Sequence, residues 1–122
     1  GIRLEVDVPA GLTVSGNAAA LQTVFDNLVE NGLRYAASYI RMELTGEEEG
    51  GYLLTVENDG APIPQPTLNV LYKGADGNFG LGLYIAKKIV QFHKGDIWAS
   101  NWADGVRFQL LLRREDRMAG RR

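Results

Sequence analysis

Cysteine is absent from this chain, which excludes disulfides and thiolate chemistry and is compatible with a reducing compartment. Long hydrophobic runs are absent too, since no apolar stretch approaches the length of a membrane span and no signal-peptide pattern opens the chain. Positive charge is not in excess, because the formal net charge is −2. The one basic cluster, within residues 113–122, is interrupted by acids and is typical of a solvated tail. We therefore expect no nucleic-acid partner and no direct membrane contact.

The composition that remains is that of a globular domain, with 45% hydrophobic and 23% charged residues in 122 positions. This length suffices for one domain with a substantial core. We expect the domain to cover residues 1–113 and residues 114–122 to form a flexible C-terminal tail. Gly1 leads directly into a strand-like segment, which suggests a piece of a longer protein.

Hydrophobic periodicity predicts an α+β fold. Alternating or β-rich segments predict strands, at residues 2–6, 12–14, 39–44, 52–57, 97–99 and 106–112. Helical periodicity predicts two long helices, from about residue 17 to 36 and from 81 to 93. The glycines and acids of 46–51 predict a hairpin turn, and the prolines of 58–66 disfavour both helix and strand. This order predicts a two-layer α/β sandwich, whose mixed sheet carries its helices on one face.

Two glycines, Gly80 and Gly82, stand at the start of the second predicted helix. The first N–H groups of a helix have no intrahelical partner and carry partial positive charge, so they bind anions. Glycine lets a phosphate approach this backbone without a Cβ in the way. The same spacing also occurs in ordinary close packing, so the glycines alone leave both interpretations open.

The first predicted helix has a polar face opposite its apolar face. Asn27, Asn31 and Arg34 fall within about 60° of one another on a helical projection. Two neutral amide oxygens one turn apart are able to hold Mg²⁺ without repelling phosphate, and an arginine one turn further is able to pair with a phosphate oxygen. The alternative is a plain polar surface, and the helix alone does not decide between the two.

Three segments, which contain four sequence boxes, together resemble a known family. Residues 21–35 (LQTVFDNLVENGLRY) resemble the N box of the ATP-binding domain of sensor histidine kinases, and residues 56–64 (VENDGAPIP) resemble its G1 box. Residues 71–85 (LYKGADGNFGLGLYI) resemble the F and G2 boxes. The order and spacing match over essentially the whole chain. The resemblance implies the Bergerat fold, which gyrase B, the Hsp90 chaperones, MutL and the histidine kinases share, with a mobile ATP lid at about residues 64–78.

The resemblance also implies a site for ATP and Mg²⁺. Asn31 would be the metal ligand, with Asn27 supporting it, and Lys73 would lie in the lid. Arg34 stands where the family often has lysine, and Tyr35 would line the nucleotide pocket. The full set of implied ATP-binding residues is Asn27, Asn31, Arg34, Tyr35, Asn58, Gly60, Ile63, Lys73, Phe79, Gly80, Leu81, Gly82, Leu83 and Val106.

Position 27 favours phosphoryl transfer over hydrolysis. Gyrase B and MutL carry Glu four residues before the magnesium-binding Asn, as the general base that activates water, whereas Asn27 cannot accept a proton near neutral pH. The resemblance implies a protein-histidine kinase that passes the γ-phosphoryl of ATP to a histidine on a separate dimerisation domain, for relay to a response regulator. That histidine lies outside this chain, because His93 falls on an apolar arc and is typical of a packed or helix-terminal residue. The chain would therefore be a cytoplasmic domain, without autokinase activity of its own, from a membrane-anchored bacterial sensor.

Three residues depart from the family pattern. Asn58 stands where an Asp usually accepts a hydrogen bond from the adenine amino group, although its amide still offers an acceptor oxygen. Pro62 replaces a glycine, and Val106 stands where many members have Thr. These changes motivate an alternative, in which the chain is a degenerate nucleotide-binding module that regulates without transferring phosphate.

Overall fold

The computed structural model describes residues 1–48, 50–70 and 80–114. In these ranges the elements follow one another as β1 (Arg3–Asp7), α1 (Ala18–Tyr35), β2 (Tyr39–Glu48), β3 (Gly51–Asn58), α2 (Gln65–Val70), α3 (Gly80–Phe92), β4 (Asp96–Trp102) and β5 (Gly105–Arg113). None of these helices is both long enough and apolar enough to cross a lipid bilayer.

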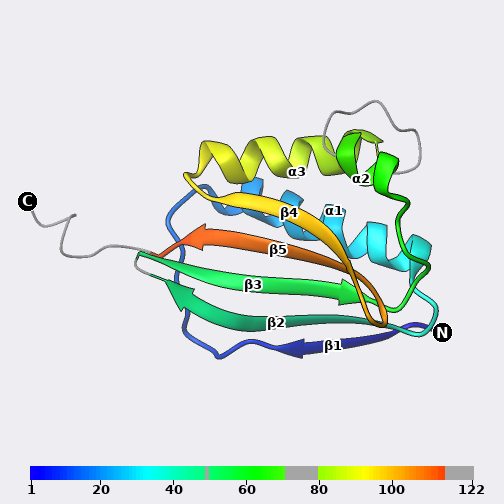
Figure 1. The fold of residues 1–122 in the computed structure, drawn as a ribbon. Coiled ribbons are helices and arrows are strands. Elements are labelled where there is room, and N and C mark those ends of the chain that lie inside the picture. Colours follow the sequence, from blue (N-terminus) through cyan, green and yellow to red (C-terminus); the bar gives the residue numbers. More distant parts are fainter. Residues whose placement is uncertain (49, 71–79, 115–122) are drawn as a thin grey trace, which may run out of the picture.

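The strands form one five-stranded sheet in the order β1-β2-β3-β5-β4. β1 is parallel to β2, to which α1 connects it as a crossover, and the other neighbouring pairs are antiparallel. Figure 1 shows the helices above one face of this sheet. The predicted two-layer sandwich with a mixed, mainly antiparallel sheet is therefore confirmed.

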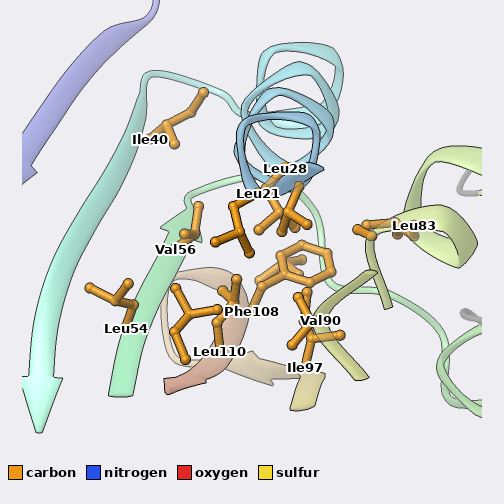
Figure 2. Close-up of a cluster of buried hydrophobic side chains, with 14 of the residues drawn as sticks. Leu21, Leu28, Ile40, Leu54, Val56, Leu83, Val90, Ile97, Phe108 and Leu110 are labelled. Carbon is orange, nitrogen blue, oxygen red and sulfur yellow. The ribbon is translucent and has the colours of Figure 1, made fainter. Parts of the chain in front are cut away.

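Asn17 caps helix α1, since its side chain accepts a hydrogen bond from the Ala20 N–H at 2.9 Å. Its apolar residues recur at helical spacing and point to the sheet. Figure 2 shows these side chains meeting residues of α3 and of the strands in one cluster. The labelled members of this core are Leu21, Leu28, Ile40, Leu54, Val56, Leu83, Val90, Ile97, Phe108 and Leu110.

A row of cross-strand neighbours lies at one end of the sheet, on the face that the helices cover. Ile40 pairs with Asn58, Asn58 with Val106, and Val106 with Asn101. Because side chains alternate along a strand, this row shares the face that carries Val56 and Phe108. The row thus places two asparagines, Asn58 and Asn101, at the edge of an otherwise apolar layer.

The hairpin prediction was wrong in its boundaries. Residues 46–48 belong to β2, and Gly51 belongs to β3. The strands continue because the register shifts between Leu44 and Gly46, as in a β-bulge, which lets the pairing resume beyond the glycine. Gly50, with φ at +76°, stands in the turn.

Two further corrections concern short elements. Residues 12–14 are no strand, since Val14 makes only an isolated bridge to Arg114. Helix α2 lies where the prolines predicted neither helix nor strand, and Pro66 is tolerated because a first-turn residue needs no backbone donor. The rest of the expected lid, residues 71–78, lies outside the described residues. β4 and β5 also extend beyond the predicted 97–99 and 106–112.

Candidate functional site

A pocket of about 200 Å³ opens where the terminal row of the sheet meets α1. Asn31 and Tyr35 contribute from α1, Asn58 and Val106 from the sheet, and the chain after β3 supplies the remaining wall. The lining residues are Asn31, Tyr35, Asn58, Ala61, Pro62, Ile63, Pro64 and Val106. The structure therefore brings together Asn31, Tyr35, Asn58, Ile63 and Val106 of the predicted site, and the departures at 58, 62 and 106 leave the pocket open.

Asn58 is a buried polar residue in the lining of this pocket. Its side chain is buried, and Oδ1 accepts a hydrogen bond from the Gly60 N–H at 2.8 Å. Gly60 in turn lies against the end of α1, where a Cβ on it would stand 2.2 Å from the Tyr35 carbonyl oxygen. Only glycine permits this approach, so the segment after β3 is held against α1.

The N-terminus of α3 lies next to Asn27. The Nδ2 amide of Asn27 donates to the Gly82 carbonyl oxygen at 3.0 Å, which leaves Oδ1 of Asn27 available. A Cβ on Gly82 would meet Asn27 only at 3.7 Å, an ordinary contact. Packing against α1 therefore does not require glycine at position 82. Asn27, which holds Gly82, precedes the pocket residue Asn31 by one turn of α1.

The other predicted residues are distributed around this arrangement. Gly80 and Leu81 stand in the first turn of α3, and Leu83 is buried in the core. Arg34 is exposed in the last turn of α1 and does not line the pocket. The remaining two, Lys73 and Phe79, lie outside the described residues.

Asp59 has a structural role that the sequence analysis missed. Its Oδ1 accepts hydrogen bonds from the backbone N–H groups of Ala37, Ser38 and Tyr39 at 2.9 to 3.1 Å, and its Oδ2 accepts from the Ser38 hydroxyl. The Ser38 hydroxyl and these N–H groups hold the pKa of Asp59 well below its usual range. The carboxylate thus fastens the α1–β2 connection beside the pocket.

We predict that Asp59→Asn lowers the free energy of unfolding at pH 7, because an amide loses the charge-assisted bonds and places a donor beside donors. A carboxyl whose pKa is lowered by folding stabilises the fold fully at pH values above its pKa in the unfolded chain, which is near 4. This contribution is lost as the pH falls towards the lower pKa of the folded state. The difference between the wild type and the variant in urea unfolding should therefore shrink from pH 7 to pH 3. The exposed Asp7→Asn is the control and should stay within about 0.5 kcal/mol of the wild type. A difference that is constant over this pH range would contradict the assignment.

Asn101 is a second residue that the sequence analysis missed. Its Oδ1 accepts from the Ile63 N–H and its Nδ2 donates to the Ile63 carbonyl, both at 2.8 Å. This pair of bonds fixes a pocket-lining residue from β4. The signal was present in the sequence, since Asn101 continues the core-facing alternation of Ile97 and Ala99 and is polar where an apolar residue would be expected.

His93 is packed at the far end of the two long helices. Its Nε2 accepts a hydrogen bond from the Asn17 N–H at 3.0 Å, and Nδ1 lies 2.8 Å from the Ile89 carbonyl oxygen. Because a carbonyl accepts only, Nδ1 carries the proton and the ring is a neutral tautomer. The interpretation of His93 as a packed, helix-terminal residue is confirmed.

Known proteins are similar to this chain in sequence and in fold. The sensor histidine kinase CssS of Bacillus subtilis (strain 168) is 32% identical over 112 residues, which cover 88% of this chain and 25% of CssS. The sensor protein BasS of Escherichia coli (strain K12) is 30% identical over 118 residues, which cover 90% of this chain and 32% of BasS. The chain thus spans about a quarter to a third of these relatives.

This chain is also similar to solved structures of histidine kinases, and it matches the model of a protein family. The nucleotide-free catalytic domain of histidine kinase ThkA matches with a TM-score of 0.82 and 26% identity, over 92% of this chain and 78% of that one. The model of the family described as histidine kinase-, DNA gyrase B- and HSP90-like ATPase matches residues 16–116. This chain is therefore a member of that ATPase family.

Proposed function

We propose that this chain is the ATP-binding catalytic domain of a two-component sensor histidine kinase. It binds ATP and donates the γ-phosphoryl group to a histidine on a separate dimerisation domain, from which the phosphoryl group passes to a response regulator. The membership of the family and the similarity to sensor kinases over most of the chain support this proposal. In this proposal the chain is a cytoplasmic part of a membrane-anchored bacterial sensor.

The observation that carries the proposal is the hydrogen bond from Asn27 to Gly82. This bond holds the N-terminus of α3, which suits phosphate, against Asn27, and Asn27 lies one turn of α1 before a residue of a pocket whose size suits a nucleobase. That pocket residue is Asn31. A nucleotide with its base against Val106 and its phosphates towards Gly82 would fit this arrangement.

The polar residues have distinct proposed roles. Asn31 and the uncommitted Oδ1 of Asn27 offer neutral oxygens, the ligand type that Mg²⁺ prefers beside phosphate, so these residues fit the metal. When bound, Mg²⁺ would neutralise part of the phosphate charge. Tyr35, Ile63 and Val106 would hold the base, Arg34 would contact phosphate, and Lys73 would belong to the lid.

The site suits transfer to a second protein better than hydrolysis. The side chain at position 27 is an amide already bound to Gly82, so it does not activate water as a carboxylate would. The chain's one histidine, His93, is also unsuited as acceptor, since Nε2 and Nδ1 both face backbone partners. The acceptor histidine therefore belongs to another domain.

The test measures binding of a non-hydrolysable ATP analogue by calorimetry, with and without Mg²⁺. We predict Mg²⁺-dependent binding that Asn31→Ala weakens about 10- to 100-fold, because one ligand to a charged group contributes about 1.5–3 kcal/mol. In EDTA the variant and the wild type should differ little. Glu30→Ala, on an exposed position of the same helix, is the matched control and should leave the affinity unchanged.

Phosphoryl transfer is tested separately, with the parent's dimerisation domain and γ-labelled ATP. Label on the histidine of that domain supports the kinase, whereas binding without transfer would instead support a regulatory nucleotide-binding module. No binding at millimolar nucleotide would overturn the proposed function.

A further inference from the structure

Asn58, at the part of the pocket where we place the base, has an amide whose oxygen and nitrogen have different environments. Asn58 is 3% exposed and lines the pocket. The Gly60 N–H fixes its orientation, because a donor must face the amide oxygen rather than the amide nitrogen. A flipped amide would set Nδ2 against that N–H and lose the 2.8 Å bond.

The Nδ2 group of Asn58 therefore remains for a ligand. Within the described residues, Nδ2 donates to no acceptor, and it is not fully buried, while Asn58 itself lines the pocket. Water satisfies such an accessible donor, and a ligand acceptor would take the place of that water. The oxygen keeps a second lone pair beyond the bond to Gly60, so the same amide also accepts.

We propose that this pocket accepts 6-oxopurine nucleoside triphosphates as well as ATP, with Asn58 as the residue that determines this breadth. The inference rests on the proposed function, which places a purine here. The Watson–Crick edge of adenine offers a donor and an acceptor, and the N1–H and O6 of hypoxanthine or guanine offer the same pair in reverse. In its fixed orientation the amide offers one partner to either group at position 6, since Oδ1 would accept from the amino group of adenine and Nδ2 would donate to O6 of a 6-oxopurine. A carboxylate would accept from the amino group but has no donor for O6 and would repel it.

The walls beside Asn58 do not oppose this breadth. Ile63 and Val106 are buried and apolar, and Val106 is the direct cross-strand neighbour of Asn58. Asn101 is the neighbour on the other side of Val106. Its side-chain oxygen and nitrogen are both hydrogen-bonded to the backbone of Ile63. Of Asn58, Ile63 and Val106, only Asn58 carries a polar side chain, so the proposal assigns discrimination at position 6 of the purine to Asn58.

The experiment compares the dissociation constants of ATP and ITP, which differ only at position 6 and N1 of the base, for the wild type and Asn58→Asp. In the wild type we expect the two constants to agree within about 10-fold. In Asn58→Asp we expect the preference for ATP to rise by at least about 10-fold, since removing a matched polar partner costs about 1.4 kcal/mol or more. Asn17→Asp makes the same chemical change at the cap of α1 and should leave the ratio unchanged.

Each result decides the inference. A wild-type preference for ATP above about 30-fold, or an Asn58→Asp ratio within twofold of the wild type, would overturn it and leave the ATP-binding function intact. If neither triphosphate binds, the proposed function fails together with the inference. Circular dichroism melts of all three proteins show whether a change in ratio comes with intact folding, and the ratio itself is insensitive to a uniform loss of binding-competent protein.

Discussion

Gly60→Ala should destabilise the domain by about 3 kcal/mol, at the upper end of the range for overpacking. The added Cβ would lie 2.2 Å from the Tyr35 carbonyl oxygen and 2.9 Å from Asn58 Oδ1. Since Tyr35 O belongs to backbone, relief requires a movement of the end of α1 or of the segment after β3. In a domain of this size we expect the melting temperature to fall by about 10 °C.

The matched control is Gly46→Ala. A Cβ at position 46 would meet only Leu53, at 3.7 Å, and should leave the melting temperature within a few degrees of the wild type. Gly60→Ala should also weaken nucleotide binding, because Gly60 holds Asn58 through their hydrogen bond. A Gly60→Ala protein that melts within about 2 °C of the wild type would show that the approach of Gly60 to α1 is not a rigid feature of the fold.

The sequence was sufficient to predict the elements whose signal is local. The helical spacing of Leu21, Val24 and Leu28 predicts α1, and the structure buries these residues and begins the helix at Ala18, close to the predicted residue 17. Asn31 was a candidate from the polar face of its helix as well as from the resemblance to a family, Asn58 from the resemblance alone, and the structure brings both to one pocket. The two-layer arrangement followed from the order of the elements.

What could not be predicted depends on contacts between distant segments. Asp59 binds backbone groups about twenty residues away, and Asn101 binds Ile63 from a strand 38 residues later. Nothing in the local pattern reveals such pairs, because each depends on the register of the sheet. The uncommitted donor of Asn58 is of the same kind, since its orientation depends on the neighbouring Gly60 N–H.

Gly82→Ala should lower the affinity for nucleotide without lowering the stability of the fold. We expect the affinity for Mg-ATP to fall about 30- to 100-fold, as the methyl group occupies the space through which phosphate approaches the start of α3 and removes bonds of about 2–3 kcal/mol. We expect the free energy of unfolding to be unchanged or raised by up to about 1 kcal/mol, because alanine replaces glycine inside a helix. Calorimetry and urea unfolding measure the two effects.

The contrast decides between the two interpretations that the glycine pattern left open. If Gly82 served only to pack α3 against α1, alanine would cost stability, yet the nearest atom of Asn27 stands 3.7 Å from the added Cβ and leaves room for it. Lys88→Ala, at an exposed position of the same helix, controls for helix propensity and should leave affinity unchanged. A Gly82→Ala protein that binds Mg-ATP as tightly as the wild type would show that phosphate does not approach α3 at this residue. Weak binding together with undiminished stability would mean that the glycine is kept for the ligand, since the fold itself has space for a larger side chain.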